Sequence, residues 1–416
     1  MNKELKNDIF TISSIHNNFY RNLDSIIEFV KSVSPITKKI DKVSMERMKY
    51  INKELNSIIH SAANKVHDRK TSTIKIRLSL EQYNRFKAIW ESNADVKPPH
   101  SIILYKSSFI MLISYLDFLI SDLIHFYFQS FPESVSNDLS IKLGDLILCS
   151  NLEDAIRNIS SEEIDKILFN NLNYQKKFFK EKFKIDLKEN IIKWDLINEA
   201  IERRNIIIHN NCKVNKRYLN SINLDLIPEK KKLLKEGIEL TVNYDYFINI
   251  YYEVLLCGTI LIQCCFRKWD KNSIEKADDF LMQDMYEILL KEKWELAERL
   301  GLIIKENDCL KTISNNAIKL VLFINYCQAL KWQNKNSELE KELSNIDTSS
   351  LSPKFILGVS ALKDDEKTFY ENIENAIIVD NMTKDYFEEW PIFRNFRKNP
   401  EYMNRIQKVF KKIDKK

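Results

Sequence analysis

The sequence predicts an all-α protein, and three observations support this fold class. The chain has 416 residues but only five glycines and eight prolines, the residues that the tight turns of β-proteins need. Apolar residues recur at helical spacing over most of the length. Two segments, 103–128 and 244–266, are long and almost wholly apolar, as expected for helices buried inside a bundle. A chain of this length also favours two or three domains.

The composition points to a protein that buries a real core. Hydrophobic residues make up 44% of the chain and charged residues 30%. Lys and Arg (64) exceed Asp and Glu (59) by only five, a weak indication of a polyanionic partner such as RNA. The seven cysteines form no CxxC pair and have no metal-ligand spacing with histidine. The stretch MNKELKNDIF has no apolar signal core. We therefore expect a cytoplasmic protein with reduced thiols, no metal and no cofactor.

The range 1–100 is expected to form an N-terminal helical segment. Apolar residues at helical spacing predict a first helix that Pro35 closes. A second helix at 43–66, a short strand at 73–80 and a helix at 80–92 should follow. Four histidines in this range are interpreted as solvated surface residues: His16, His60, His67 and His100.

The range 101–266 is expected to form a helical bundle. Its helix at 103–128 contains charged residues, which are costly at bilayer depth, so a buried bundle helix is favoured over a membrane span. One polar seam runs along this apolar helix and needs partners: Ser114, Asp117, Ser121 and His125. The seam is either functional or a structural set of hydrogen bonds between helices. A later basic and aromatic run, 174–185, suits an amphipathic surface helix better than an RNA-binding element.

The stretch WDLINEAIERRNIIIHNNCKVNKRYL, 194–219, is the most informative part of the chain. A helical wheel forms an apolar arc from six residues: Leu196, Ile197, Ala200, Ile201, Ile207 and Ile208. The wheel places Asn198, Glu202, Asn205 and His209 on the opposite side. Arg204 falls within the apolar arc, where a permanent cation needs a carboxylate or a bound phosphate. Asp117 is the candidate carboxylate.

The polar residues His209, Asn210 and Asn211 are expected to end this helix. The segment RNIIIH, Arg204–His209, with its flanking ERRN and HNN, resembles the HEPN superfamily of helical-bundle proteins. Many HEPN members are ribonucleases marked by Arg, four to six residues and then His, often with a polar residue directly after the Arg. Asp117 lies where many members carry an acidic residue on an earlier helix. The resemblance covers roughly 100–266. By chance alone an Arg-x4-His pair is expected about 0.2 times in a chain of this composition. The pattern itself is therefore weak evidence, and the resemblance depends on the residues around it and on the acid of the earlier helix.

The resemblance implies metal-independent cleavage of RNA by attack of a ribose 2′-OH on the adjacent phosphate. His209 would then act as general base or acid, and Arg204 would stabilise the charge of the phosphorane. Asn205 would orient the histidine or a phosphate oxygen, and Asp117 would hold Arg204. Three neighbouring residues are candidate contacts to the substrate: Arg203, Asn210 and Lys213.

The resemblance also implies partners and a biological setting. HEPN ribonucleases generally build their site across a homodimer, and the expected substrate is single-stranded RNA. A bacterial toxin or antiviral defence effector is the expected setting, with an antitoxin or sensor protein as a possible further partner and no membrane. The alternative is a non-catalytic helical scaffold that binds RNA or a partner protein.

The range 267–416 is expected to form an array of helical hairpins. Several segments pair apolar faces at helical spacing and resemble degenerate tetratricopeptide-type helix pairs, although no clean repeat period emerges. Such an array could regulate the bundle, rigidify a dimer or bind a partner, and the sequence leaves these roles open.

Overall fold

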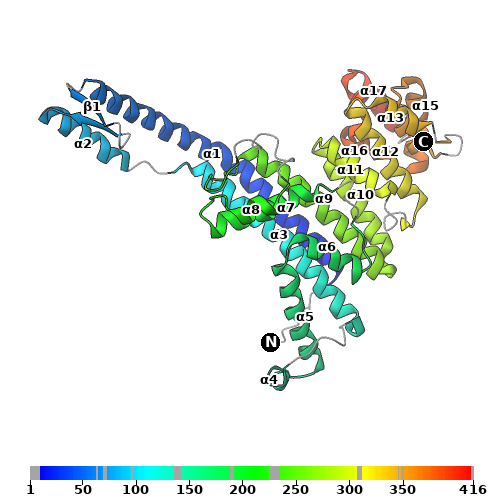
Figure 1. Cartoon of the computed structure of the whole chain (residues 1–416). Helices are drawn as coiled ribbons and strands as arrows, with labels where there is room; N and C mark the ends of the chain where they lie inside the picture. The colour runs from blue at the N-terminus through cyan, green and yellow to red at the C-terminus, as the bar shows by residue number, and fades with distance from the viewer. Residues whose placement is uncertain are drawn as a thin grey trace, which may run out of the picture. The chain divides into compact units, whose positions relative to one another are not determined.

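The fold is all-α, as predicted (Figure 1). The computed structural model describes residues 10–61, 64–68, 73–94, 98–134, 142–187, 192–223, 234–306, 312–344, 346–347 and 351–413. The helices up to residue 269 are α1 (Ile12–Ser61), α2 (Leu80–Ala94), α3 (His100–Ser130), α4 (Leu143–Ile147), α5 (Leu152–Phe169), α6 (Leu172–Glu181), α7 (Trp194–His209), α8 (Lys216–Ser221) and α9 (Tyr244–Trp269). The later helices are α10 (Ile274–Leu290), α11 (Trp294–Glu306), α12 (Asn316–Trp332), α13 (Asn336–Leu343), α14 (Pro353–Leu362), α15 (Glu366–Asp380), α16 (Lys384–Glu389) and α17 (Tyr402–Ile413).

Contacts between residues group the chain into two compact units. The array unit comprises Met1–Phe19, Asp117–Trp194 and Tyr252–Lys416. The motif unit comprises Tyr20–Leu116 and Asp195–Tyr251. Helices α1, α3 and α9 each contribute residues to both units. The three consecutive ranges expected from the sequence, 1–100, 101–266 and 267–416, stay a prediction.

In the motif unit, α1 continues through Pro35, so the prediction that this proline ends the first helix was wrong. A proline inside a helix removes one backbone hydrogen bond and costs about 3 kcal/mol. Buried contacts on both sides of Pro35 offset this cost. The Ser34 Oγ lies 2.6 Å from the Tyr105 hydroxyl of α3, and both Val30 and Thr37 are buried. The helix expected at 43–66 is therefore the second half of α1, which ends at Ser61.

Asp41 of α1 caps the N-terminus of α3. Its carboxylate accepts hydrogen bonds from the backbone N–H groups of His100, at 2.6 Å, and Ser101, at 3.0 Å. The first N–H groups of a helix have no partner within the helix, and the helix dipole favours a negative charge there. Burial would raise the pKa of Asp41, but the hydrogen bonds from Ser101 and His100 outweigh burial and lower this pKa.

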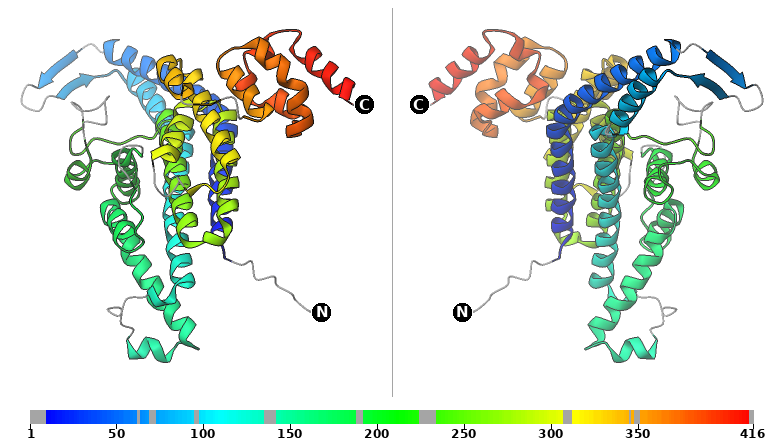
Figure 2. Two further views of the ribbon diagram at one scale, coloured as in Figure 1. Left: turned by 90° about the vertical axis from the view of Figure 1, so that its right-hand side faces the viewer. Right: turned by 90° about the vertical axis from the view of Figure 1, so that its left-hand side faces the viewer.

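A small hairpin and α2 follow the end of α1 (Figure 2). Strand β1 (Asn64–Asp68) pairs with β2 (Thr73–Arg77) in antiparallel register, with Lys65 opposite Ile76. The strand predicted at 73–80 is thus present but shorter. Helix α2 returns to α1 through an ion pair between Arg85 and Glu54. The Gln82 amide also donates to the Ser61 hydroxyl at 3.2 Å.

In the array unit, α10 to α15 form consecutive helical pairs. Helix α10 packs on α11, α12 on α13, and α14 on α15. The first helices of these pairs also contact each other, α10 with α12 and α12 with α14. Short turns join the two helices of each pair, and a residue in the left-handed region stands in each turn: Glu292, Asn334 and Asp364. The sequence therefore predicted the helical hairpins correctly.

His16 is buried in the array unit, so its interpretation as a solvated histidine was wrong. The Nε2 atom of His16 lies 3.1 Å from both carboxylate oxygens of Asp284 in α10. Its ring stacks on Phe280 with 4.0 Å between centroids. The buried carboxylate explains how a polar ring fits inside this core. Of the other histidines, His60 and His100 are exposed, and His67 lies among residues whose burial the structure does not describe.

By length and composition, α3 and α9 are each long and apolar enough to cross a membrane, which is weak evidence by itself. In α9, 83% of the apolar window is buried within the protein. Glu253, the charge that interrupts α9, is buried and accepts hydrogen bonds from both terminal nitrogens of Arg299, at 2.6 and 2.7 Å. Helix α3 is 44% buried over its window and exposes Ile103 and Phe118. The expectation that α3 is buried all round was therefore wrong.

Candidate functional site at the end of helix α7

Helix α7 of the motif unit carries the Arg-x4-His motif and ends at His209, as the sequence predicted. A tight turn fixes this end. The N–H groups of Asn210 and Cys212 both donate to the Ile206 carbonyl, at 3.0 and 3.2 Å. Asn211 and Cys212 have positive φ values of 46° and 62°, a left-handed turn typical of helix C-termini. The backbone that carries His209 is therefore held on both sides.

The three motif residues differ in exposure. His209 is exposed, whereas Arg204 and Asn205 are half-buried. Asn205 and His209 are four residues apart and share one side of the helix. Arg204 and His209 are five apart, which corresponds to roughly 140° around an α-helix. Within one chain, these two side chains thus start from different sides of α7.

The fully buried arginine of the motif stretch is Arg203 and not Arg204. Arg203 and Glu199 are each 3% exposed. The Arg203 Nε donates to Glu199 Oε1 at 2.7 Å, and its Nη1 donates to the Thr241 carbonyl at 2.7 Å. The guanidinium also lies over the Tyr246 ring, 4.1 Å from the centroid. This buried cation is thus held by two acceptors and an aromatic ring.

Two tyrosines complete this network around Glu199. The Tyr218 and Tyr246 hydroxyls donate to Glu199 Oε1 and Oε2 respectively, each at 2.5 Å. Burial and then the negative charge of Glu199 raise the pKa of both tyrosines well above the usual range, so both stay protonated donors. Burial would lower the pKa of Arg203, but the charges of Tyr246 and Glu199 outweigh burial and raise this pKa. The network is a structural anchor for α7 that the sequence analysis missed.

This anchor also corrects the predicted faces of α7. Glu202, assigned to the polar side, is buried, and Ile208, assigned to the apolar arc, is exposed. The core under the end of α7 contains one motif residue, Ile206, with five later residues: Val214, Tyr218, Ile222, Leu234 and Leu240. A wheel built on hydrophobicity alone misplaced the buried face because a charged pair, Glu199 and Arg203, occupies part of it.

The three predicted substrate contacts lie in different environments. Arg203 is enclosed in the network above and has almost no exposed surface to offer a phosphate. The Asn210 amide donates to the Lys213 carbonyl at 2.5 Å and so helps to form the turn. The Lys213 side chain is exposed, and its backbone bridges to Glu239. Of the three, Lys213 has the exposure that a contact to RNA needs.

Asp117 is half-buried on α3 and belongs to the array unit. Its predicted pairing with Arg204 stays a prediction. The polar seam of α3 is partly satisfied within the helix itself, because the Ser114 hydroxyl donates to the Ile110 carbonyl at 3.0 Å. At the far end of the seam, burial lowers the pKa of His125, although the negative charge of Asp165 acts to raise it.

A second polar group, which was not predicted from the sequence, lies beside the turn after His209. The Lys106 ammonium of α3 donates to the Cys212 sulfur at 3.0 Å and to Glu239 Oε1 at 3.4 Å. Burial would lower the pKa of Lys106, but these hydrogen bonds and charges outweigh it and raise this pKa. Lys106 therefore stays a cation that ties the turn to α3.

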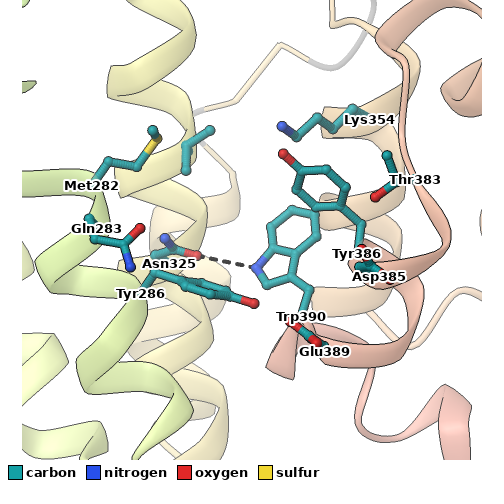
Figure 3. A pocket seen from close by; sticks show the side chains of 11 residues that line it. Met282, Gln283, Tyr286, Asn325, Lys354, Thr383, Asp385, Tyr386, Glu389 and Trp390 are labelled. Carbon is teal, nitrogen blue, oxygen red and sulfur yellow. Dashed lines mark hydrogen bonds between the residues drawn. The ribbon is translucent and has the colours of Figure 1, made fainter. Parts of the chain in front are cut away.

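The array unit contains a cavity of about 400 Å³, which none of the predicted site residues lines (Figure 3). Figure 3 shows Trp390 among the lining residues, and its indole Nε1 donates to Asn325 Oδ1 at 3.4 Å. Tyr286 and Tyr386 add two further rings, and the Lys354 ammonium lies 4.8 Å from the Tyr386 centroid. Aromatic walls with a few polar groups are typical of sites for small ligands or single side chains.

Comparisons with protein-family models, curated proteins and solved structures found no match for this chain. Among the residues that the structure describes, no group of three or more His, Cys, Asp or Glu side chains is placed to hold a metal ion.

Proposed function

We propose that this chain is a metal-independent endoribonuclease of the HEPN type, with its site at the end of α7. One observation supports the proposal most strongly. The exposed His209 ends α7 on a side shared with Asn205, and the turn at Asn211 and Cys212 fixes that end. A general acid or base needs such a combination of access and fixed position.

The proposed reaction uses the RNA itself as the nucleophile. The ribose 2′-oxygen forms a bond to the adjacent phosphorus, and the bond from phosphorus to the 5′-oxygen breaks. His209 takes the 2′-OH proton or gives a proton to the leaving 5′-oxygen, so the products are a 2′,3′-cyclic phosphate and a 5′-OH. Arg204 stabilises the negative charge of the phosphorane, and Asn205 orients His209 or a phosphate oxygen. Asp117 is proposed to hold Arg204, and Lys213 to contact the substrate.

The positions of Arg204 and His209 favour a composite site. The two residues lie about 140° apart around α7, so in a single copy their side chains leave the helix in different directions. Both could reach one phosphate only if the side chains bent toward each other. We propose that two copies form a homodimer in which Arg204 of one copy and His209 of the other serve the same phosphate. A bacterial toxin or antiviral defence effector, controlled by an antitoxin or sensor in the cytoplasm, is the proposed setting by family resemblance alone.

One pair of substitutions tests the nuclease proposal. We expect His209→Ala to stay folded and to lose single-stranded RNA cleavage by roughly 10²- to 10⁴-fold, the usual contribution of a general acid or base. His60→Ala, which removes another exposed histidine from the motif unit, should cleave like the wild type. Cleavage should survive EDTA and leave 2′,3′-cyclic phosphate ends. These ends block ligation at the 3′-end even after phosphatase treatment, and they permit it only when acid has opened the cyclic phosphate before the phosphatase is added. Full activity of His209→Ala would refute the proposal.

The second candidate function is a non-catalytic scaffold, and the cavity around Trp390 favours it. In that case the array unit binds a small ligand or a partner side chain and no RNA is cleaved. Tyr386→Ala opens the wall of the cavity at a residue that is 42% exposed, so the fold should tolerate it. Loss of partner binding by Tyr386→Ala, with His209→Ala unaffected in every assay, would favour the scaffold.

A further inference from the structure

Helix α1 carries two parallel series of residues in the motif unit, and only one of them is covered. The first series, which we call the inner seam, runs from Val30 to Ile58 by alternate steps of four and three residues. Every position in it is buried or half-buried. It includes Ser34, which contacts Tyr105, and Asp41, which caps α3. The inner seam thus attaches α1 to its own chain.

The second series, the outer seam, starts one residue earlier and has the same alternate steps. Its apolar members are Phe29, Val33, Ile36, Ile40, Val43 and Tyr50. Five of these six are exposed, with exposures between 41% and 64%, and Val33 is half-buried. The remaining position is Arg47, whose aliphatic stem can lie on an apolar surface while its charge reaches solvent. Single exposed apolar residues are ordinary, but a continuous stripe of them marks an interaction site.

The spacing of the outer seam identifies its occupant as a helix. Apolar residues that alternate by three and four positions form the a and d positions of a heptad repeat, which pack against the same positions of another helix. The outer seam extends over 22 residues of α1, from Phe29 to Tyr50, which is about 33 Å at 1.5 Å per residue. Since the inner seam already holds α1 in helical form, association does not bear the cost of helix nucleation.

We propose that the outer seam binds the outer seam of a second copy of this chain, in antiparallel orientation. The charged residues beside the outer seam favour the antiparallel orientation. Lys39 and Glu46 are exposed and occupy the same flanking heptad position, seven residues apart. In an antiparallel pair centred between Ile40 and Val43, Lys39 of each copy faces Glu46 of the other, and Ile40 packs on Val43. Such self-complementarity is what a twofold interface requires.

A parallel pair lacks this match. In parallel coiled coils, the flanking position of Lys39 and Glu46 faces the opposite flank of the partner helix. On α1 that opposite flank holds Ser44 and the buried Ile51. Neither residue is charged, so neither can form an ion pair with Lys39 or Glu46 of a parallel partner. This inference does not require that the chain cleaves RNA, although it shares with the composite site proposed above the requirement that two copies associate.

The first test measures association of the full chain by sedimentation equilibrium and mass photometry. We expect a concentration-dependent dimer for the wild type and a Kd raised at least about 100-fold by Ile40→Glu, which buries a charge in the seam. Met45→Glu is the matched control: Met45 is 56% exposed on the same helix but belongs to neither seam. It should dimerise like the wild type, and circular dichroism should show equal helicity for all three proteins.

The second test uses charge exchange and separates a second copy from other occupants. Lys39→Glu and Glu46→Lys should each weaken the dimer, roughly tenfold, because each places like charges opposite one another. The double variant should restore wild-type association, because both pairs form again in reversed order. A monomeric wild type at all concentrations, or a double variant weaker than both single variants, would overturn the proposal. Binding of monomeric wild type to phosphatidylglycerol vesicles, lost in Ile40→Glu, would assign the seam to lipid and also overturn it.

Discussion

Arg203 and Glu199 form a buried ion pair one helical turn apart on α7, with 2.7 Å between the Arg203 Nε and Glu199 Oε1. The next residue, Arg204, is only half-buried. Two adjacent arginines in one motif stretch therefore have separate tasks: Arg203 anchors the helix, and Arg204 is the one proposed to serve the reaction. The two residues therefore lead to two predictions, one on the free energy of unfolding and one on the rate of RNA cleavage.

Removal of the Glu199 carboxylate should destabilise the motif unit strongly. Glu199→Ala leaves Arg203 as an uncompensated buried cation and removes the acceptor of Tyr218 and Tyr246. We expect the free energy of unfolding to fall by about 3–5 kcal/mol, as when one partner of a buried ion pair is removed. Urea denaturation followed by circular dichroism measures the change.

The control for this prediction is an ion pair with the same helical spacing on the surface. Lys177 and Glu181 of α6 lie 3.8 Å apart, and both side chains are more than 60% exposed. Glu181→Ala should change the free energy of unfolding by less than about 1 kcal/mol. Equal effects of Glu181→Ala and Glu199→Ala would contradict the structural role of the buried pair.

Substitution of Arg204 should affect cleavage far more than stability. Arg204→Ala is expected to reduce RNA cleavage by roughly 10²-fold or more, because a cation that stabilises the phosphorane is lost. Arg204→Lys should recover only part of the rate, because lysine cannot present two parallel donors to a phosphate. Rates of both variants on a short single-stranded RNA test this prediction. A variant that loses stability and activity in proportion would indicate that Arg204 is only structural.

The contribution of Asp41 to stability should depend on pH. Its pKa is lower in the folded protein than the ordinary value of 3.8. The stabilisation is therefore fully present above pH 3.8 and is lost as the pH falls through the folded pKa. At pH 7, Asp41→Ala should lower the free energy of unfolding by about 0.5–2 kcal/mol, the usual value of a helix cap. The difference between wild type and variant should shrink at pH 3, and a difference that grows there would contradict the prediction.

Two glycines in helices should respond to alanine in opposite ways. A Cβ atom on Gly258 of α9 would overlap the ring of Phe19 in the array unit, whereas a Cβ on Gly144 of α4 would meet nothing within 4 Å. Gly258→Ala should cost about 1–3 kcal/mol through overpacking. Gly144→Ala should be neutral or stabilise the helix by up to about 1 kcal/mol. Thermal unfolding of both variants measures the contrast, which disappears if α1 and α9 do not pack at Phe19.

The cysteines should differ in their reactivity toward an alkylating reagent. Cys149 is half-buried, whereas Cys257, Cys264 and Cys265 of α9 are buried in the array unit. Brief treatment of the native protein with iodoacetamide, followed by peptide mass spectrometry, should find Cys149 modified before the three cysteines of α9. Burial raises the pKa of the Cys257 thiol, which further lowers its reactivity. Early modification of Cys257 would contradict the packing of α9.

The sequence predicted the fold class and the end of the motif helix well, because both depend on local patterns. Few glycines and prolines and a helical apolar period indicated the all-α fold. The polar run after Ile208 indicated the end of α7, and the structure ends α7 at His209. The helical pairs from α10 to α15 were also visible as apolar faces separated by short polar breaks.

Features that depend on contacts distant in sequence were missed or wrongly predicted. Pro35 appeared to end a helix because its buried neighbours, such as Ser34 against Tyr105, lie far apart in the chain. Arg204 was taken for the buried arginine because it falls within the apolar arc of the helical wheel, which gave no place to Glu199 and Arg203. Their spacing of four residues was visible, but the two tyrosines and the Thr241 carbonyl that make their burial possible were not.

The interleaving of segments between the two units has a consequence for the order of synthesis. All segments of the motif unit have left the ribosome once residue 251 is free of the exit tunnel, whereas the array unit still waits for 252–416. The unit that carries His209 can thus complete its own core while more than a third of the chain is yet to be made. Neither unit is one continuous piece of chain, so no single cut releases either of them.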